Sequence, residues 1–571
     1  MSQASATRSQ EPDDLPTSSA APDTASSTFV PPHPGSTQMP HWGAAELIDA
    51  PHFTWRNWFA MIGPGLVAGG SAIGGGEWLM GPVVTARYGG GLLWLAMLSI
   101  LFQTVYNVEI SRYTLYTGEP IFTGKFRTLP GPMFWLCVYV VLDFGMIFPY
   151  LAANAATPLA AVLWGRMPQP GIIDGDESGL RVLSYVIFIG SFVPLVIGGK
   201  VYNSIKALMF FKIVVVFGFL LFVAAVYSSW NTWSEIGSGF LKIGSVPVQT
   251  GTDVDGNGQI DPHERKEEVK NAFVSVAKGE GLPAIDFTLL ASIAAMVAIA
   301  GNGGLSNTPI SNYTRDQGWG MGWHVGAIPS MIGGRKIKLS HVGSVFQVTA
   351  LSLGRWRRWY RHVLRDQFVV WMPACIIGLA LPSMMSVEFL PRGTEANKWT
   401  AAGMTAGAIR DRVSDPSVPL GSENTGQFFW YMTLLCGFLV LAPSMVTTVD
   451  GVVRRWVDVF WTASPRLRAL ETTAIKKVYF WVLAFYGGFG LIMLSVSEPT
   501  KLLETAALIL NYALGFSCWH TLAVNTFLLP PALRPNWLIR ICLLVGGLFF
   551  TVLSVLSTLQ KLGLLEKLAS A

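Results

Sequence analysis

Charged residues are scarce in this chain of 571 residues: they make up 13% of it, whereas about 25% is usual for a soluble globular protein. Apolar residues reach 51% and gather in long runs. A soluble protein of this composition would need a very large dry core beneath almost no polar surface. The composition therefore indicates an integral membrane protein in a lipid bilayer. The modest net charge of +5 gives no indication of a nucleic-acid partner.

Cysteine is scarce too. The five cysteines lie inside apolar runs, without a Cys-x-x-Cys pair, so we expect packing residues rather than a metal or redox site. The sequence also lacks a nucleophile elbow, a zinc-protease motif and a phosphate-binding loop. We therefore expect no enzyme and no organic cofactor.

A long apolar stretch is missing from residues 1–52, which are rich in Ser, Thr, Pro and Ala. Without an apolar core, this segment is not a signal peptide. Its composition predicts a disordered cytoplasmic tail.

The rest of the chain holds eleven apolar runs that are candidates for membrane spans, each of which needs about 20 mostly apolar residues. The runs lie at about residues 58–88, 91–111, 133–163, 182–197, 207–227, 287–313, 366–385, 428–449, 479–496, 503–529 and 538–557.

Basic residues in the connections predict the orientation. The connection between the sixth and seventh runs (314–365) and the one between the eighth and ninth are strongly basic, whereas the loop after the third run is acidic. Basic loops stay in the cytoplasm. We therefore expect a multi-pass protein of the cytoplasmic (inner or plasma) membrane with a cytoplasmic N-terminus. An odd number of spans then puts the C-terminus outside.

Glycine runs interrupt the first and sixth apolar runs, at residues 74–76, directly before Glu77, and at residues 301–304. Each glycine weakens a helix by about 1 kcal/mol against alanine, so we expect both helices to unwind. Unwound backbone at membrane depth is tolerated only inside protein or beside a water-filled cavity, and an ionisable residue there marks a functional site. Close helix packing is the alternative, but each glycine run is also the most polar point of its span.

The two interruptions are five spans apart, which predicts two inverted five-helix repeats. The predicted fold is all-α and integral to the membrane: about eleven transmembrane helices in two inverted repeats, with discontinuous helices 1 and 6, plus one extra helix. The predicted divisions are the tail (1–52), the first repeat (53–228), an external loop (229–283), the second repeat (284–529, including the basic connection 314–365), and the eleventh helix with the external C-terminus (530–571).

Paired interruptions in matching halves predict the substrate site of a transporter. Freed carbonyls and a carboxylate suit a cation, whereas the N-terminus of a half-helix suits an anion. The carboxylate of Glu77 favours a cation. The predicted substrate-binding residues are Ile73, Gly74, Gly75, Gly76, Glu77, Gly301, Asn302 and Gly303.

From Gly63 through Gly89 to Trp94, the sequence resembles the first span, and the lead into the second, of the natural resistance-associated macrophage protein (Nramp) family. This family of divalent metal transporters belongs to the amino acid–polyamine–organocation superfamily, with the leucine-transporter-type fold. Eleven spans in this orientation also fit the family. The resemblance covers about residues 55–557 and implies alternating-access transport of a divalent metal.

The chain departs from the family at the metal site. The family motif Asp-Pro-Gly-Asn is replaced here by residues 74–77, so that Gly74 stands for the metal-binding Asp and Glu77 for the Asn. The sixth-span Met-Pro-His motif falls near residues 301–303, where a thioether is missing. Soft sulfur helps to select transition metals, whereas an oxygen-only site suits a harder cation such as Mg²⁺. We therefore favour a divalent cation of the Mg²⁺ kind over Mn²⁺ or Fe²⁺.

The resemblance also suggests a coupling residue. Asp143 matches a family Asp on the proton route, but the family Glu three residues later is Met146 here. Asp143 is thus the predicted residue for proton or ion coupling, and a structural pair within the bundle is the alternative. Asn511 lies near the family's metal-contacting Gln and joins the predicted substrate-binding residues.

The external loop contains a complete EF-hand template over residues 253–264, with Gly258 at its turn. The predicted Ca²⁺ ligands are Asp253, Asp255, Asn257, Gln259, Asp261 and Glu264. Residues 264–278 predict an exiting helix, whereas residues 241–252 make a poor entering helix. We therefore predict a single structural Ca²⁺ site rather than a paired sensor.

Three functions follow as hypotheses. The first is a secondary transporter of a divalent cation. The second is a cation-coupled symporter of a small organic solute such as an amino acid, for which the glycine-lined gap leaves room. The third is a calcium-responsive membrane sensor.

Overall fold

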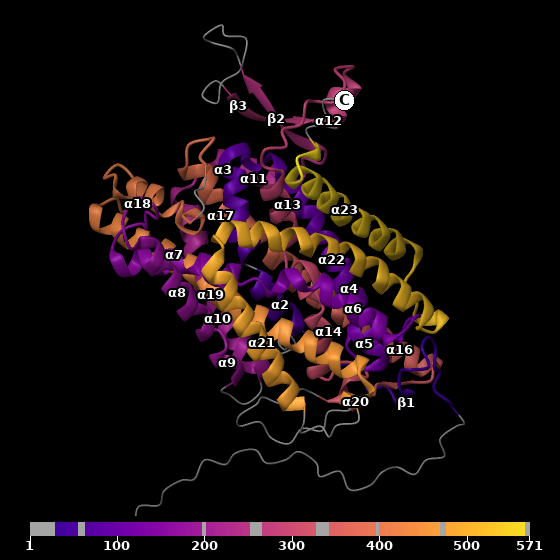
Figure 1. The fold of residues 1–571 in the computed structure, drawn as a ribbon. Coiled ribbons are helices and arrows are strands. Elements are labelled where there is room, and N and C mark those ends of the chain that lie inside the picture. The colour runs from indigo at the N-terminus through magenta and orange to yellow at the C-terminus, as the bar shows by residue number, and fades with distance from the viewer. Residues whose placement is uncertain are drawn as a thin grey trace, which may run out of the picture.

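The computed structural model describes residues 29–54, 63–72, 74–196, 201–251, 265–326, 342–395, 399–468 and 475–565. Most of them form helices packed into one bundle, and within these ranges the strands form two two-stranded sheets at its margins (Figure 1). The predicted all-α membrane fold is confirmed.

The first repeat and its connections contain α2 (Pro64–Ala72), η1 (Gly76–Met80), α3 (Gly81–Tyr88), η2 (Gly89–Leu92), α4 (Leu93–Thr117), α5 (Ile121–Arg127), α6 (Pro132–Leu142), η3 (Phe144–Ile147), α7 (Tyr150–Trp164), α8 (Asp176–Gly190), α9 (Val193–Val196) and α10 (Val201–Tyr227). The loop that follows contains α11 (Trp230–Gly239), β2 (Ser245–Gly251), β3 (Arg265–Asn271) and α12 (Ala272–Ala277).

The second repeat and the last helix contain α13 (Leu290–Ile299), η4 (Gly304–Asn307), α14 (Pro309–Asp316), α15 (Gly322–Val325), α16 (Ala350–Arg365), η5 (Asp366–Trp371), α17 (Met372–Phe389), η6 (Ala401–Gly403), α18 (Ala406–Ser414), α19 (Glu423–Ala463), α20 (Pro465–Arg468), α21 (Ile475–Val496), α22 (Pro499–Phe527), η8 (Pro531–Leu533) and α23 (Trp537–Lys561).

Ten helices among the described residues are long and apolar enough to cross a membrane. The first, Gly76–Thr117, has 42 residues, so that at 1.5 Å per residue it would be about 63 Å long, twice the ~30 Å of a bilayer core. It is interrupted at η2, where Gly89 has a φ of 62°. The η2 turn packs against α11, while the far end of α4 lies near α5 and α16 (Figure 1). This run therefore contains two spans, and the total agrees with the eleven predicted.

The third predicted span is not one continuous helix. It is divided into α6, η3 and α7, and the α-helix α6 ends at Leu142. Phe148 is extended, and Pro149, which has no N–H to continue the ladder, precedes α7. The break places Asp143 and Met146 in irregular backbone rather than on a helix face.

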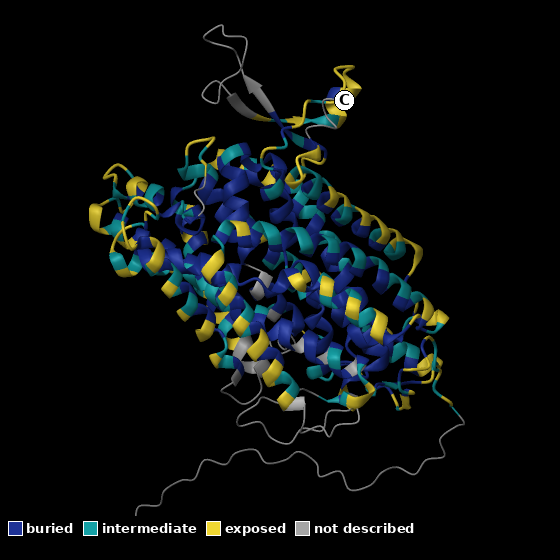
Figure 2. Ribbon diagram, in the orientation of Figure 1, coloured by how far each residue is buried: buried dark blue, intermediate teal, exposed yellow. Residues whose placement is uncertain are grey.

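Many residues on the outer helices are exposed (Figure 2), and large apolar side chains are among them. Examples are Phe210 on α10, Trp481 on α21 and Leu548 on α23, which are 55%, 71% and 56% exposed. Exposed apolar surface of this extent needs an apolar surrounding, which the hydrocarbon core of a membrane supplies.

The external loop corrects one prediction. Residues 265–271 form strand β3, paired antiparallel with β2 from Ser245↔Asn271 to Gly251↔Arg265, so the helix expected over 264–278 begins only at Ala272. Asn271 caps it, because its side-chain oxygen accepts hydrogen bonds from the Phe273 and Val274 amides. The predicted Ca²⁺ ligands (residues 253–264) lie outside the described residues, between the two strands.

Residues 29–54, which we call the N-terminal segment, correct another prediction. We expected a disordered tail up to residue 52, but Trp42 and Leu47 are buried against the bundle at 3% and 0% exposure. The short strand β1 (Gly43–Ala44) pairs in parallel with β4 (Ser344–Val345). The prediction rested on the Ser, Thr, Pro and Ala content of residues 1–52 as a whole, which outweighed the few buried anchors near its end.

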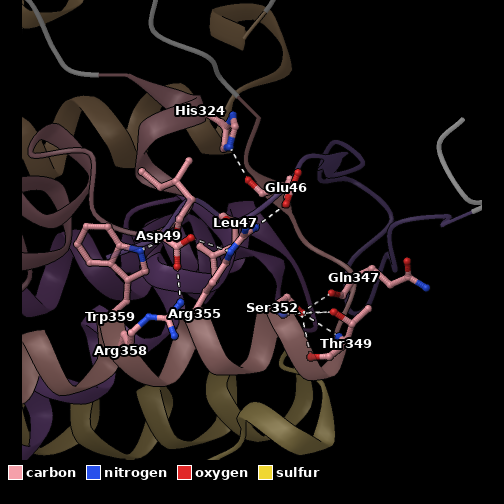
Figure 3. A network of polar contacts seen from close by, with 11 residues as sticks. Glu46, Leu47, Asp49, His324, Gln347, Thr349, Ser352, Arg355, Arg358 and Trp359 are labelled. Carbon is pink, nitrogen blue, oxygen red and sulfur yellow. Dashed lines mark hydrogen bonds and ion pairs between the residues drawn. The ribbon is translucent and has the colours of Figure 1, made fainter. Parts of the chain in front are cut away.

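The N-terminal segment is fixed to α16 by charge (Figure 3). Arg355 bonds to Glu46, and Arg358 bonds to Asp49. The indole of Trp359 donates to the backbone oxygen of Ile48 at 2.9 Å. Part of the basic connection, to which the sequence assigned no role, therefore holds the N-terminal segment.

Candidate functional site

The first broken helix begins on a carboxylate from another span. The Gly63 and Gly65 amides donate to the two carboxylate oxygens of Asp366, at 3.2 and 2.6 Å. The first amides of a helix have no partner within the helix, and a carboxylate there also interacts favourably with the helix dipole. Asp366 opens η5, so the start of α2 is tied to the segment that connects α16 and α17.

The two breaks meet in the core. The α-helix α2 ends at Ala72, Ile73 lies outside the described residues, and η1 begins at Gly76. A Cβ added at Gly76 would lie 2.5 Å from the carbonyl carbon and oxygen of Ile299. Glycine at position 76 therefore lets the first break touch the end of α13.

The sixth-span break needs glycine for a different reason. Gly301, Gly303 and Gly304 have φ values of 90°, 69° and 53°. Residues with a side chain rarely adopt this left-handed backbone conformation, whereas glycine adopts it without steric strain. The predicted unwinding is thus confirmed between α13 and η4.

Gln103 on α4 holds the sixth-span break. Its side-chain oxygen accepts from the amides of Asn302 and Gly303 and from the side chain of Asn307, at 3.2, 3.0 and 2.8 Å. Its NH₂ group donates to the Ala300 carbonyl at 2.6 Å. Gln103 was not among the predicted site residues, and the available signal was a side-chain amide in an apolar span.

Glu77 joins the two breaks. One carboxylate oxygen accepts from the Gly301 amide at 2.7 Å and the other from the Gly74 amide at 3.1 Å. The side chain is fully buried. The Glu77 carboxylate therefore lies behind the glycines that line the cavity and is not an open ligand.

The breaks enclose a small cavity, which gives the centres of water molecules about 40 Å³ of space. It is lined by Ala68, Gly74, Gly75, Met146, Tyr150, Leu151, Ile299, Gly301, Asn302, Ser306, Pro309, Ile310, Tyr313, Thr447, Thr448, Gly451 and Arg455. Space of this size holds a few waters or one small ion.

Four predicted residues line this cavity: Gly74, Gly75, Gly301 and Asn302. The side-chain oxygen of Asn302 has no hydrogen-bond partner among the described residues. A buried polar oxygen without a partner is costly, which makes it a candidate contact for a cargo or its water. Gly76, Glu77 and Gly303 lie directly behind the wall.

Asn511 is not among the residues that line the cavity in the described part of the chain. Its NH₂ group donates to the Ala294 carbonyl at 3.0 Å, which ties α22 to α13. This bond is structural, and the ligand role suggested by the resemblance stays a prediction.

Asp143 is part of a buried ion pair. Its carboxylate lies 3.0 Å from the Arg455 guanidinium and accepts from the Trp456 indole at 2.7 Å. This arrangement matches the structural alternative that the sequence left open. Arg455 also lines the cavity, so the pair adjoins the site without opening Asp143 to it.

Met146 and Tyr150 are cavity residues that sequence reasoning missed. They flank the break in the third span, and the wall also includes the hydroxyl residues Thr447 and Thr448 of α19. In the comparison with the family, Met146 was noted only because it replaces a Glu. Met146 thus brings a sulfur-containing residue to a site that appeared to lack one once the sixth-span motif was gone.

The described residues contain no group of three or more His, Cys, Asp or Glu side chains that could hold a metal ion. A cation in the cavity would therefore be held by neutral oxygens and by the charge of Glu77 behind them, not by several carboxylates.

Two five-span repeats, each with a broken first helix at a shared cavity, define the leucine-transporter-type class of fold. Solved structures agree. A mutant of the Eremococcus coleocola manganese transporter matches with a TM-score of 0.55 and 11% identity, over 90% of this chain and 89% of that one. The same transporter in complex with an aromatic bis-isothiourea substituted compound matches with a TM-score of 0.54 and 13% identity, over the same shares. No family model and no curated protein matches the chain.

Proposed function

We propose that this protein is a secondary transporter that moves a small cation across the membrane by alternating access. One observation carries the proposal: two broken helices enclose a small polar cavity, and a single buried carboxylate, Glu77, bonds to both breaks. Irregular backbone inside a membrane is a recurrent feature of transporter binding sites.

The cargo that we favour is a hard divalent cation such as Mg²⁺. The cavity gives water centres about 40 Å³ of space, which is room for one small ion with a few of its waters. Mg²⁺ also keeps several of its waters when bound. The Asn302 amide and the hydroxyls of Thr447 and Thr448 can bond to such waters, so direct carboxylate ligands are not needed.

The test is uptake into proteoliposomes that contain the purified protein, with a panel of Mg²⁺, Ca²⁺, Mn²⁺ and Fe²⁺. We expect saturable Mg²⁺ uptake that Asn302→Ala weakens at least tenfold. The matched control is Leu548→Ala on the outer face of the bundle, which should leave uptake unchanged. Equal uptake by the Asn302 variant would contradict the site.

A second candidate is symport of a small organic solute such as an amino acid, and Arg455 is the observation that favours it. Arg455 lines the cavity together with Tyr150 and Tyr313, and guanidinium groups bind carboxylates well. Thermal-shift titration with an amino-acid panel decides between the two: stabilisation by an amino acid but by no cation would favour this candidate.

We also propose that residues 253–264 bind Ca²⁺ in a structural role, on the strength of the complete ligand template. The β2–β3 hairpin brings the two ends of this loop together, which lowers the entropy that binding must overcome. Calorimetric titration should show one site, which Asp253→Asn combined with Glu264→Gln abolishes. A Ca²⁺-dependent change in uptake would instead favour the sensor hypothesis.

A further inference from the structure

Lys212 is a charged side chain buried at the centre of the bundle, on α10. It is 0% exposed, and its ammonium donates to the Ser444 hydroxyl of α19 at 2.6 Å. Ser444 lies one helical turn before the cavity residues Thr447 and Thr448, and its carbonyl accepts from the Thr447 hydroxyl at 2.9 Å.

The first broken helix packs closely on the same part of α10. A Cβ added at Gly70 of α2 would lie 2.7 Å from the Cβ of Met209, one turn before Lys212. Lys212 therefore stands where α2, α10 and α19 meet, beside the elements that form the cavity.

Among the elements packed on α10, α2 and α9 carry no titratable residue. On α17, Cys375 is buried, and Glu388 accepts from the Ser229 amide and the Thr232 hydroxyl just beyond the end of α10. On α19, Arg455 is paired with Asp143, and Asp450 accepts from the Tyr313 hydroxyl at 3.2 Å. The Lys212 ammonium is thus tethered through Ser444 to a helix that lines the cavity.

This inference rests on the proposed cation transport. We propose that Lys212 is its coupling residue and that the protein exchanges the cargo cation for a proton. A cation in the cavity and the Lys212 ammonium are like charges close together in the buried bundle, because Ser444 tethers Lys212 one helical turn from the cavity residues Thr447 and Thr448. Because like charges in a poorly screened interior repel strongly, binding of the cation and protonation of Lys212 oppose each other.

The step balances simply. When the cation enters, an N–H bond of the ammonium breaks, the proton leaves to water, and the electron pair stays on nitrogen. The neutral amine can then accept a hydrogen bond from Ser444. After the cation departs on the far side, a proton from that side restores the ammonium, so one proton travels opposite to each cation. Asp143 cannot take this role while Arg455 and Trp456 hold it.

The experiment compares Mg²⁺ uptake into proteoliposomes without a pH gradient, with an acidic interior and with an alkaline interior, while a trapped dye reports internal pH. We expect the acidic interior to raise the initial rate several-fold and the internal pH to rise during uptake. Faster uptake with the alkaline interior would overturn exchange in favour of symport. If no arm shows Mg²⁺ uptake, the proposed function itself fails.

The variants Lys212→Gln and Lys212→Met should still take up Mg²⁺ down its gradient, but without any change of internal pH. A second measurement covers poor reconstitution: calorimetric Mg²⁺ titration in detergent, in two buffers of different ionisation enthalpy. The wild type should release close to one proton per cation bound and both variants none. Equal proton release by wild type and variants would overturn the assignment of Lys212.

Discussion

The Glu77 carboxylate accepts a hydrogen bond from the Gly301 amide at 2.7 Å, between residues 224 positions apart in the chain. With the bond from Gly74, this one side chain fixes the distance between the two breaks. A charged acceptor suits the position because its two oxygens can both accept, which a neutral amide cannot do.

Glu77→Gln should therefore lower Mg²⁺ uptake more than tenfold. The Gln NH₂ group would face one of the two amide donors, and a hydrogen bond to a charged group contributes about 1.5–3 kcal/mol. The measurement is initial uptake at equal protein incorporation. Unchanged uptake would show that the carboxylate is not part of the site.

Gly76→Ala should also abolish uptake, and for a steric reason. The new methyl group would lie 2.5 Å from the backbone of Ile299, which cannot move without opening the contact between the breaks. Gly218→Ala on α10 is the matched control, because a Cβ there meets nothing within 4 Å and alanine favours a helix by about 1 kcal/mol. Wild-type uptake by the Gly76 variant would refute the close approach.

Met146→Leu should lower the uptake of Mn²⁺ more than the uptake of Mg²⁺. Leucine keeps the volume of the side chain but removes the thioether, which prefers Mn²⁺ and Fe²⁺ over Mg²⁺. We expect Mg²⁺ uptake within twofold of wild type, and any Mn²⁺ uptake to fall severalfold further. An equal loss for both metals would show that Met146 acts through packing alone.

Charge reversal of Glu46 and Asp49 to lysine should release the N-terminal segment from α16. The pairs with Arg355 and Arg358 are largely exposed, so each is weak and weakens further with salt. Limited proteolysis should therefore cut within residues 29–54 faster in the variant. Adding Arg355→Glu and Arg358→Glu should slow cleavage again, and failure of that rescue would argue against the ion pairs as anchors.

The buried pair Glu119–Arg127 beneath the N-terminal segment predicts a loss of stability in acid. Burial alone would raise the pKa of Glu119, but Arg127 outweighs it and holds the pKa below its usual value. A lowered folded pKa means that the pair stabilises the fold above the ordinary carboxyl pKa of about 4.3. This stability is lost as the pH falls through the lower folded pKa. Thermal unfolding in detergent from pH 7 to pH 3 should show the drop, and Glu119→Gln should flatten it.

Much of the fold follows from the sequence because hydrophobic length and glycine placement act locally. The glycine runs before Glu77 and from Gly301 have low helix propensity, so both breaks were predictable. The break around Asp143 was not, because its cause is a proline at position 149 and a buried pair with Arg455, more than three hundred residues away.

The cavity wall shows the same limit. Gly74 and Asn302 could be predicted because a glycine run and a polar residue stand out in an apolar span, whereas Met146 and Tyr150 resemble ordinary core residues. Their place at the site comes from how α7 packs against α19, which a single sequence does not reveal. The ligand role of Asn511 stays a prediction, because its NH₂ group bonds to the backbone of a neighbouring helix.

The bond between Asp366 and the first amides of α2 has a mechanical consequence. The helix from Ala350 to Phe389 runs without interruption for 40 residues, and it carries both the contacts of the N-terminal segment and Asp366. Because this helix is bonded to the N-terminal segment and to the first amides of α2, a shift of the helix acts on both contacts. The half-helix α2 must either follow it or part from both oxygens together. We therefore expect the opening of this side to occur as an abrupt jump between two settings, visible as two resolved populations in single-molecule distance recordings.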